Sequence, residues 1–267
     1  MATAVICEFN PFHNGHKYLL ESAKNVLKEP VIAIMSGSFT QRGEVAVCDK
    51  FVRAKSALEN GADLVLELPV VFSLSGAEGF AKAGVAIASA FECTNHLAFG
   101  SESGDCELLK KSANAVCDER VQALVRDGMK NGGYYPRELE NAVKTVFGDE
   151  ISSVLCEPNN ILGVEYIKAL NGTGVEPFSV ARTGVAHDSR IAGEGFASAS
   201  HIREMLRNGE NAKKYAPYIP DEITFPENLD RPLLYRLRTM TREDIAKLPD
   251  VGEGLENRIA DAAVRCS

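Results

Sequence analysis

The amino-acid sequence predicts an α/β fold in which helices cover both faces of an open parallel sheet. Short apolar runs, typical of buried strands, alternate with segments of helical periodicity along most of the chain. The spacing between successive runs suits right-handed crossover connections. Ligands of such sheets bind at the carboxyl ends of the strands, near the switch in strand order. We therefore expect the loops that follow the strands to form the functional site.

The bulk composition is that of an ordinary globular chain, with 267 residues, of which 45% are hydrophobic and 25% are charged. A chain of this length can bury a full α/β core and carry a smaller appendage. No apolar run reaches the roughly 18 residues of a membrane span, and the N-terminus lacks a signal sequence. Seven dispersed cysteines without a CxxC pair are typical of reduced thiols. We expect a cytoplasmic protein with no membrane contact, no disulfides and no metal site.

The first strand, over residues 4–7, leads through a loop into a helix over residues 16–26. The loop is rich in turn residues, namely Asn10, Pro11, Asn14 and Gly15. A strand that passes through such a loop into a helix brings unpaired backbone N–H groups and the positive end of the helix dipole to one place. Anions bind at such places. Since Gly15 has no Cβ, a nucleotide can approach the backbone closely there, and we predict a phosphate-binding loop.

Two histidines, His13 and His16, flank this glycine. Imidazoles at a helix N-terminus can donate hydrogen bonds to phosphate oxygens and stabilise charge on a leaving pyrophosphate. By themselves the two residues fit ordinary surface polarity equally well. Their position at the end of a strand–loop–helix unit favours the phosphate site.

The next three strands are predicted at residues 31–35, 63–68 and 96–99, with helices at 50–59, 75–91 and 108–147, the last broken at 131–133. Asp49 is the expected N-cap of the helix over 50–59. That helix carries a basic cluster of Lys50, Arg53 and Lys55, which fits a solvated face at least as well as a substrate contact. The loop over residues 36–44 carries Arg42 beside the predicted site.

Three later positions are candidates for nucleotide contacts. Gly100 follows a strand and either forms a simple turn or lets a ribose or adenine lie against the backbone. Asn159 and Asn160 open a helix, where one amide can cap it and the second can bind a ligand. Arg182 ends a fifth strand over residues 176–182, where its guanidinium suits phosphate or ribose oxygens. His187 and Asp188 follow and either make a polar contact or order the loop.

A second anion-binding element is predicted at residues 197–203. Ser198 and Ser200 stand at a helix start, where they can cap the backbone and leave further N–H groups free for an anion. Arg203 lies one turn into the same helix. Alone, this segment would be a capped helix with an exposed arginine. Two anion sites of complementary kind in one chain are better explained by a shared ligand.

The C-terminal part changes in composition after Gly209. Residues 215–220 are predicted to be a linker, and residues 233–237, 242–248 and 255–264 to form short helices. The net charge of −8 does not favour binding of nucleic acid through the overall field, so RNA contact requires a local basic cluster. The most basic run contains Arg231, Arg236, Arg238 and Arg242. It fits either solvated helix faces or an RNA backbone contact.

These motifs resemble known families. The string His13-Asn14-Gly15-His16 resembles the HxGH signature of the nucleotidyltransferase superfamily, and the longer string from Glu8 to His16 resembles the bacterial tRNA(Met) cytidine acetate ligase family. Further segments match in family order, at residues 36–42, 100–102, 159–163 and 197–203. The resemblance implies a Rossmann-like nucleotidyltransferase fold with a smaller helical C-terminal part.

The resemblance also implies a domain organisation. Residues 1–212 correspond to the ATP-binding nucleotidyltransferase-like domain. Residues 213–267 correspond to a helical C-terminal region, which we expect to be incomplete relative to the family, because family members continue with further basic helices.

The implied activity is a two-step ligation in which acetate and ATP form acetyl-adenylate, and the acetyl group then passes to N4 of the wobble cytidine of elongator tRNA(Met). The resemblance assigns His13, His16 and Arg203 to catalysis. It assigns to ATP, accompanied by Mg²⁺, the residues Cys7, Glu8, Phe9, Asn10, Pro11, Phe12, Asn14, Gly15, Lys17, Tyr18, Gly100, Asn160, Arg182, Ser198 and Ser200.

Two other functions remain open at this point. The first is a nucleotidyltransferase that adenylylates a phosphorylated metabolite, as other HxGH proteins do. The second is a nucleotide-binding or RNA-binding module without turnover. The oligomeric state is not indicated by the sequence.

Overall fold

The computed structural model describes residues 1–182 and 195–266. His187 and Asp188, which the sequence marked as a polar segment, lie outside the described residues. The chain divides into two compact units, Met1–Ile223 and Thr224–Ser267. The domain limits expected at residues 212 and 213 stay a prediction, because compactness by itself does not assign a function to either part.

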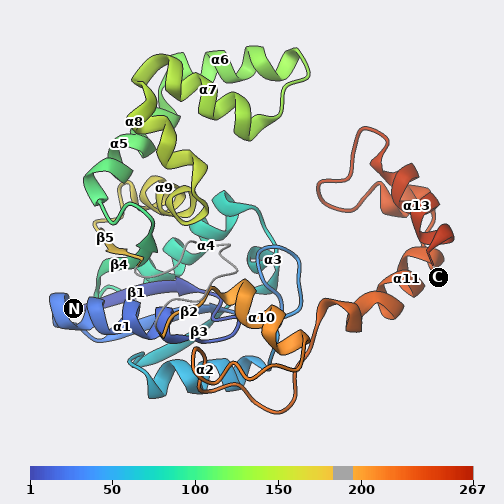
Figure 1. Cartoon of the computed structure of the whole chain (residues 1–267). Coiled ribbons are helices and arrows are strands. Elements are labelled where there is room, and N and C mark those ends of the chain that lie inside the picture. The colour runs from blue at the N-terminus through green and yellow to red at the C-terminus, as the bar shows by residue number, and fades with distance from the viewer. Residues whose placement is uncertain (183–194, 267) are drawn as a thin grey trace. The chain divides into compact units, whose positions relative to one another are not determined.

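A five-stranded sheet forms the centre of the first unit (Figure 1). Its strands are β1 (Ala2–Cys7), β2 (Val31–Ser36), β3 (Leu64–Leu68), β4 (Thr94–Ser101) and β5 (Glu176–Ala181). All neighbouring strands pair in parallel, in the order β3-β2-β1-β4-β5. The predicted open parallel sheet is confirmed. The order switches between β1 and β4, so the crevice that such sheets use for ligands lies at the carboxyl ends of these two strands.

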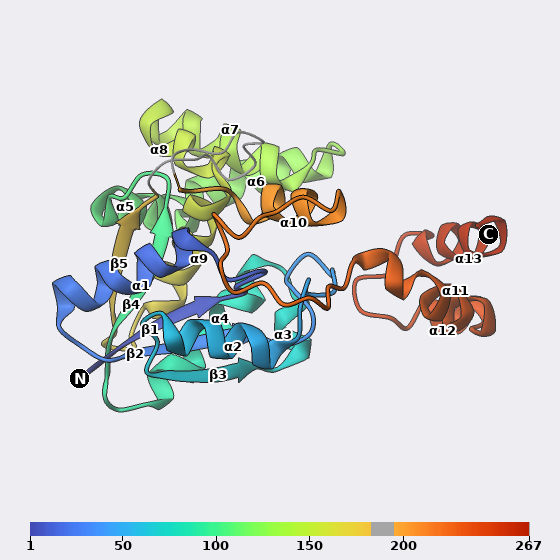
Figure 2. The same cartoon turned by 60° about the horizontal axis from the view of Figure 1, so that its bottom comes forward.

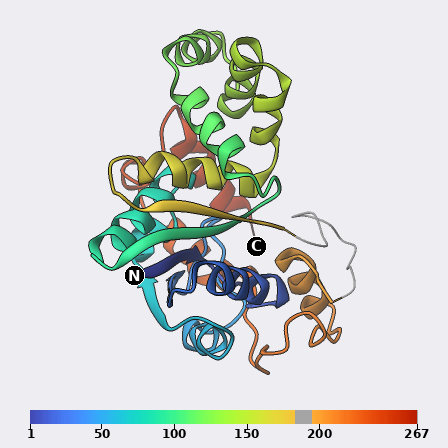
Figure 3. The ribbon, with the colours of Figure 1, turned by 90° about the vertical axis from the view of Figure 1, so that its left-hand side faces the viewer.

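Helices cover both faces of the sheet (Figure 3). On one face lie α1 (Asn14–Leu27) and α2 (Lys50–Glu59), and on the other lie α4 (Ala77–Ala90) and α9 (Pro158–Leu170). Strand β1 is buried along its whole length. Its alternate side chains enter different clusters, Val5 with Leu20 of α1 and Ile6 with Phe80 of α4. An uninterrupted apolar run is the sequence pattern that such a two-sided strand requires.

The helical region between β4 and β5 differs in detail from the prediction. It contains α5 (Cys106–Cys117), α6 (Glu119–Lys130), α7 (Tyr135–Phe147), α8 (Asp149–Ser153) and the 3₁₀ turn η1 (Val154–Cys156). The break expected at residues 131–133 is present between α6 and α7, which pack against each other as a hairpin (Figure 1). A further break lies at Asp118, whose side chain accepts a hydrogen bond from the N–H of Arg120 at 2.9 Å and so starts α6.

The predicted helix over residues 75–91 is present as α4 (Ala77–Ala90), and a separate short helix, α3 (Val70–Ser73), precedes it. One other prediction is wrong. Residues 215–220 are not a linker. Ala216 and the half-buried Ile219 pack against Ile202 of α10 (Ala199–Arg207), and Ala216 is fully buried. The small apolar residues of this segment therefore belong to the first unit.

The second unit is helical, as predicted. It contains the 3₁₀ turn η2 (Pro226–Leu229) and the helices α11 (Asp230–Thr239), α12 (Arg242–Ile245) and α13 (Leu255–Arg265) (Figure 2). Two arginines of the basic run hold it together. Arg242 donates to Asn257 at 2.6 Å and to Asp261 at 2.7 Å, and Arg238 donates to the carbonyl oxygens of Ala263 and Cys266. Within the described residues, no helix has the length and apolar character needed to cross a bilayer.

Candidate functional site

A cavity of about 300 Å³ opens in the first unit, among the loops that follow the strands. Its wall comes from the carboxyl ends of β1, β4 and β5, from the loop over residues 40–44, and from the starts of α1, α4, α9 and α10. This is the edge of the sheet at which the switch in strand order predicts a ligand.

His13 and His16 lie side by side at the start of α1, with ring centroids 3.7 Å apart. His13 is the N-cap, and its Nδ1 accepts a hydrogen bond from the N–H of Gly15 at 3.0 Å. The Nδ1 of His16 accepts in turn from the N–H of His13 at 3.3 Å. Because Nδ1 is the acceptor in each ring, a neutral ring carries its proton on Nε2. The backbone thereby fixes the tautomer of both histidines.

Both imidazoles are held neutral. Burial lowers the pKa of His13 to about 3, and the positive charges of Arg182 and Arg203 act in the same direction. Burial also lowers the pKa of His16 well below its usual value, with smaller contributions from His13 and Arg182. At neutral pH the pair therefore presents two N–H donors without a positive charge of its own.

Two phenylalanines hold the ring of His16 in place. The ring of Phe9 lies 4.9 Å from that of His16 and also 4.9 Å from that of Phe12, and both phenylalanines are buried. Phe9 adopts a left-handed backbone conformation with φ of 48°, which is unfavourable for a bulky residue. Residues in such conformations persist where the surrounding structure over-determines them, and they cluster at functional sites.

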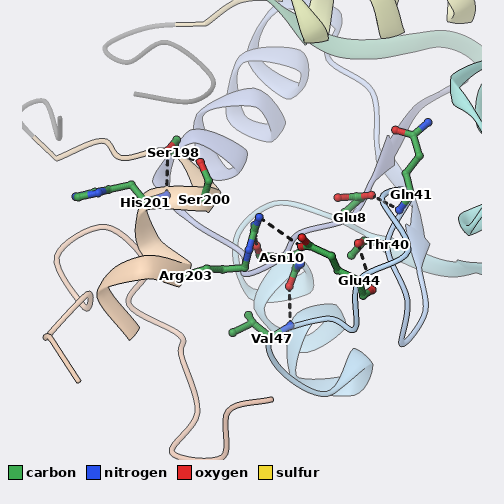
Figure 4. A network of polar contacts seen from close by, with 10 residues as sticks. All are labelled: Glu8, Asn10, Thr40, Gln41, Glu44, Val47, Ser198, Ser200, His201 and Arg203. Atoms are coloured by element: carbon green, nitrogen blue, oxygen red, sulfur yellow. Dashed lines mark hydrogen bonds and ion pairs between the residues drawn. The ribbon is translucent and has the colours of Figure 1, made fainter. Parts of the chain in front are cut away.

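The start of α10, which comes late in the sequence of the first unit, lines the same cavity (Figure 4). Ser198 is its N-cap, as predicted, and accepts from the N–H of His201 at 3.1 Å, while its hydroxyl also bonds that of Ser200 at 3.0 Å. One turn further on, Arg203 donates to the carbonyl oxygen of Asn10 at 2.9 Å. Arg203 therefore joins the α10 element directly to the histidine loop.

The loop after β2 closes the cavity on a third side (Figure 4). The N–H of Gln41 donates to Glu8 at 2.7 Å, and the N–H of Val47 donates to the side-chain oxygen of Asn10 at 2.7 Å. Glu44 lies 3.8 Å from Arg203. The sequence singled out only Arg42 in this loop and missed Thr40, Gln41 and Glu44 as cavity residues. They could have been predicted from the expected strands, because the loop after β2 begins next to the loop after β1 when the two strands are neighbours in the sheet.

Gly100 and Arg182 line the wall formed by β4 and β5. A Cβ at Gly100 would meet only Arg182, at an ordinary contact distance of 3.5 Å, and a backbone oxygen. Packing within the protein therefore does not require glycine at this position. The Nε of Arg182 is buried without a hydrogen-bond partner among the described residues. An unpaired buried donor is costly unless a ligand satisfies it.

The start of α9 is capped by a carboxylate from another segment, and the predicted asparagine cap is wrong. Glu102 accepts from the side-chain amide of Asn159 at 2.6 Å and from the N–H of Asn160 at 2.8 Å. The side-chain oxygen of Asn160 accepts from the N–H of Ser103 at 3.1 Å. Asn160 is buried and does not line the cavity, whereas Asn159 does.

The structure brings most of the sequence-predicted site residues to one cavity. Those in its wall are Cys7, Glu8, Phe9, Asn10, His13, Gly15, His16, Tyr18, Gly100, Arg182, Ser198, Ser200 and Arg203. Those that are not in its wall are Pro11, Phe12, Asn14, Lys17 and Asn160. Asn14 instead donates to the carbonyl oxygens of Gly195 and Lys214, and Lys17 lies 3.8 Å from Glu21.

An apolar wall completes the cavity and was not predicted as part of the site. It contains Ile6, Phe80, Phe99, Ile161, Leu162 and Tyr166. In the sequence these residues look like any others that pack a core, because apolar periodicity marks burial without distinguishing a core from a ligand pocket.

The described residues contain no group of three or more His, Cys, Asp and Glu side chains arranged to hold a metal ion. The polar groups in the cavity wall are mainly donors, which suit an anion. Two neutral imidazoles, two serine hydroxyls and three arginines (Arg42, Arg182 and Arg203) line the cavity at the edge of a parallel sheet that switches order. This arrangement fits the nucleotidyl transferase class of nucleotide-binding proteins.

Comparisons with known proteins agree with this class and narrow it. A family model described as HIGH Nucleotidyl Transferase matches residues 1–267. The tRNA(Met) cytidine acetate ligase of Caldanaerobacter subterraneus subsp. tengcongensis is 38% identical, over 98% of this chain and 70% of that protein. The protein of the same name from Thermosipho africanus is 35% identical, over 97% of this chain and 66% of that one. The chain belongs to the tRNA(Met) cytidine acetate ligase family.

Solved structures give the same result. The apo crystal structure of Thermotoga maritima TmcAL matches with a TM-score of 0.91 and 33% identity, over 100% of this chain and 69% of that chain. A crystal structure of the same protein bound with alpha-thio ATP matches with a TM-score of 0.89 and 34% identity, over 100% of this chain and 68% of that one. The chain thus spans about two thirds to seven tenths of the length of these relatives.

Proposed function

We propose that this protein is an ATP-dependent ligase that acetylates the wobble cytidine of elongator tRNA(Met). In the first step a carboxylate oxygen of acetate attacks the α-phosphorus of ATP, and the bond from that phosphorus to the bridging oxygen breaks. Acetyl-adenylate and pyrophosphate result. In the second step N4 of the cytidine attacks the acetyl carbon, AMP leaves, and N4 loses a proton. The product is N4-acetylcytidine.

The observation that carries the proposal is the convergence of two distant elements on one cavity. Arg203 donates to the carbonyl oxygen of Asn10, 193 positions away in the sequence, at 2.9 Å. This contact sets the serine-capped start of α10 beside the two stacked histidines. A triphosphate is an anion long enough to use both elements at once.

We assign the triphosphate to these two elements. His13 and His16 donate from Nε2 to the α-phosphate and to the leaving pyrophosphate, and Arg203, Ser198 and Ser200 hold the β- and γ-phosphates. In-line phosphoryl chemistry depends on positioning and on stabilising charge rather than on a covalent nucleophile. Donors that are already oriented by the backbone need no rearrangement as charge develops, which is the property that the fixed tautomers provide.

We assign the nucleoside to the β4–β5 side of the cavity. Gly100 leaves room against the backbone, and the Nε of Arg182, which has no partner among residues 1–182 and 195–266, is proposed to bind ribose or phosphate oxygens. Asn159 lines this wall, and Asn160 acts from behind it through Ser103. Mg²⁺ belongs to the substrate as Mg·ATP, and we assign no protein ligand to it. The roles of all these residues are proposals.

The tRNA contact is proposed for the second unit and for the segments that relatives carry beyond the length of this chain. Arg231, Arg236 and Arg265 are exposed there, whereas Arg238 and Arg242 are engaged within the unit. We place the reaction in the cytoplasm, where tRNA and ATP are available and where the seven free cysteines stay reduced.

Acetate-dependent exchange of pyrophosphate into ATP tests the first step. Wild-type protein is expected to catalyse exchange with acetate and not with a phosphate monoester in its place. His13→Ala and His16→Ala are each expected to reduce the exchange rate by about 100- to 1,000-fold, the usual loss for one oriented donor. His96→Gln is the matched control, because His96 bonds Glu29 and does not line the cavity.

Two results would contradict the proposal. Exchange that depends on a phosphate monoester would favour adenylylation of a phosphorylated metabolite. Tight ATP binding without any exchange or acyl-adenylate would favour a binding module without turnover. Transfer is tested separately, by incubating the protein with labelled acetate, ATP and tRNA(Met) and digesting the RNA to nucleosides.

A further inference from the structure

Among the described residues, Arg53 has one of the largest fully buried side chains, and the proposed reaction does not use it. Arg53 lies on α2 and is 1% exposed. The sequence placed it in a basic cluster with Lys50 and Lys55, on a face expected to be solvated. Of the two lysines in the cluster, Lys55 fits that expectation, since its side chain is 75% exposed. Arg53 turns instead toward the ends of β1 and β2.

Its guanidinium binds four backbone carbonyl oxygens from three different segments. It donates to Glu8 after β1 at 2.6 Å, to Ser36 at the end of β2 at 3.1 Å, and to Cys48 before α2 at 3.2 Å. It also donates to the carbonyl oxygen of Gly37. A guanidinium has five N–H groups in a rigid plane. That of Arg53 makes four hydrogen bonds, all to backbone oxygens.

These contacts come without an ion pair. In the part of the chain that the structure describes, every hydrogen-bond partner of Arg53 is a carbonyl oxygen, so no carboxylate there neutralises it through a direct hydrogen bond. Burial lowers the pKa of Arg53, yet arginine keeps its proton in proteins. Glu8 and Asp49 favour the charge from nearby, but every direct hydrogen bond goes to the backbone. A buried charge without a directly bonded counter-ion is costly to a fold.

The backbone that Arg53 fixes belongs to both loops on this side of the cavity. The peptide that contains the Glu8 carbonyl leads directly into Phe9, Asn10 and the histidine loop. The peptides of Ser36 and Gly37 lead into the loop that carries Gln41 and Glu44. The two loops also bond each other, through Gln41 with Glu8 and through Val47 with Asn10. Arg53 therefore hydrogen-bonds the backbone where each of the two loops begins, and it connects the two starts.

We propose that Arg53 is a positioning residue, which sets the histidine loop and the loop over residues 37–48 in register for in-line transfer at the α-phosphate. The proposal rests on the proposed function for its kinetic part. Lysine cannot take the role, because one ammonium group cannot reach four carbonyl oxygens in a fixed plane. The hydrogen bonds of Arg53 within the described part of the chain go to the ends of β1 and β2 and to Cys48, and none goes to the proposed nucleoside wall of β4 and β5. We therefore expect ground-state binding of ATP to be largely independent of Arg53.

The main test compares Arg53→Lys with Lys55→Met, a control on the same helix whose side chain is exposed. In acetate-dependent pyrophosphate exchange, Arg53→Lys is expected to lower kcat by about 100-fold, the usual effect of misplacing a reacting group by about 1 Å. The KM for ATP is expected to change by less than about fivefold, because interactions made mainly in the transition state affect kcat. Lys55→Met should match wild type in both.

Hydrogen exchange monitors the same role without any catalysis. In Arg53→Lys, the backbone amides of Gln41, Ala46 and Val47, which are hydrogen-bonded in the wild type, are expected to exchange at least about tenfold faster. Amides of α6 and α7 should exchange at the wild-type rate, because these helices are remote from α2. This measurement keeps its meaning if the wild-type protein shows no exchange activity, so failure of the proposed function and failure of this inference are distinguishable.

Three outcomes would overturn the inference. Wild-type kcat and wild-type amide exchange in Arg53→Lys would show that the loops do not depend on Arg53. A parallel rise of amide exchange throughout the first unit, or an unfolded Arg53→Lys protein, would show that Arg53 supports the whole fold rather than the loops. Arg53→Met serves as the second variant. If Arg53→Met had the wild-type kcat and amide exchange that Arg53→Lys lost, the loops would depend on the buried apolar stem of the side chain and not on the guanidinium.

Discussion

The starts of α9 and α10 border the same cavity, but one is capped by a negatively charged group and the other by a neutral one. At α9 the carboxylate of Glu102 already occupies the N-terminal N–H groups. At α10 the cap is the neutral hydroxyl of Ser198, and Arg203 follows one turn later. A helix start whose dipole is met by a protein carboxylate has little left to offer an anion, whereas a neutral cap leaves that potential in place.

The start of α1 follows the α10 pattern by different means. Its cap is the imidazole of His13, which burial keeps neutral. The starts proposed to bind the anion, α1 and α10, thus share a neutral cap, whereas the α9 start is capped by a carboxylate of the protein itself. The difference follows from which side chain reaches each helix end, since all three helices begin at the same edge of one sheet.

The largest effect that would break this comparison is expected at Arg203. Arg203→Met should lower the rate of pyrophosphate exchange by about 100-fold, because it removes a charged donor from the phosphates. Steady-state exchange kinetics measure the effect, and Arg207→Met on the same helix is the control because Arg207 does not line the cavity. Equal losses in the two variants would show that α10 contributes charge in general and not at one position.

The next effect concerns the pH dependence of stability at the α1 start. The folded-state pKa of His13 is about 3 and its ordinary value is 6.5, so the unfolded chain binds the proton more tightly. Above pH 6.5 the free energy of unfolding is not reduced by His13. As the pH falls from 6.5 toward 3, it decreases by about 1.4 kcal/mol per pH unit, because the unfolded chain takes up a proton that the folded chain does not. His13→Asn, which keeps a capping oxygen, should flatten the slope by that amount between pH 6 and pH 4, a range of about 2 units.

Urea unfolding at several pH values measures this slope. His96→Asn is the control, because His96 is outside the cavity. An unchanged slope in His13→Asn would mean that His13 is not held neutral, and the proposed neutral donor at the α1 start would be wrong.

A smaller effect is expected at the α9 start. Glu102→Gln replaces a charge-assisted cap by a neutral one and should cost about 2 kcal/mol of unfolding free energy. Glu157→Gln is a matched control, since Glu157 is the N-cap residue of α9 and makes no side-chain cap hydrogen bond. Thermal unfolding measures both. If Glu102→Gln also bound ATP more tightly, the α9 start would be a latent anion site and the contrast with α10 would weaken.

The smallest effect is expected for the cap of α10. Ser198→Ala should cost about 1 kcal/mol and Ser198→Gly a few tenths, the usual difference for an N-cap. Urea unfolding gives both values. If Ser198 also binds phosphate, Ser198→Ala should in addition raise the KM for ATP. Asp118→Ala, which removes the N-cap of α6 outside the cavity wall, should not raise it.

Local chemistry made several of these features predictable. The N-caps Asp49 and Ser198 were found because a capping side chain bonds an N–H two or three residues away. The buried strands were found because both faces of β1 and β2 are covered, so that every position is apolar or small. The two histidines around Gly15 were found from their place between a strand and a helix.

Other features were beyond the sequence, and they share a physical cause. Glu102 caps N–H groups 57 and 58 residues later, Arg53 reaches Glu8 across 45 positions, and Ala216 packs in one cluster with Ile202 instead of lying in a linker. None of these partners is in the same helix or loop, so no local pattern encodes them. A buried arginine and a solvated one also look the same in a basic cluster on a helix.

The sequence by itself determined the strands, the caps Asp49 and Ser198, and the position of the two motifs proposed to bind the anion, because these depend on periodicity and on hydrogen bonds between near neighbours. The tertiary structure decided which helix starts remain open to an anion, which arginine is buried, and which asparagine lines the cavity. These depend on the register in which separate strands place their loops. That register is set by packing across the whole sheet, where segments distant in the chain come within hydrogen-bond distance.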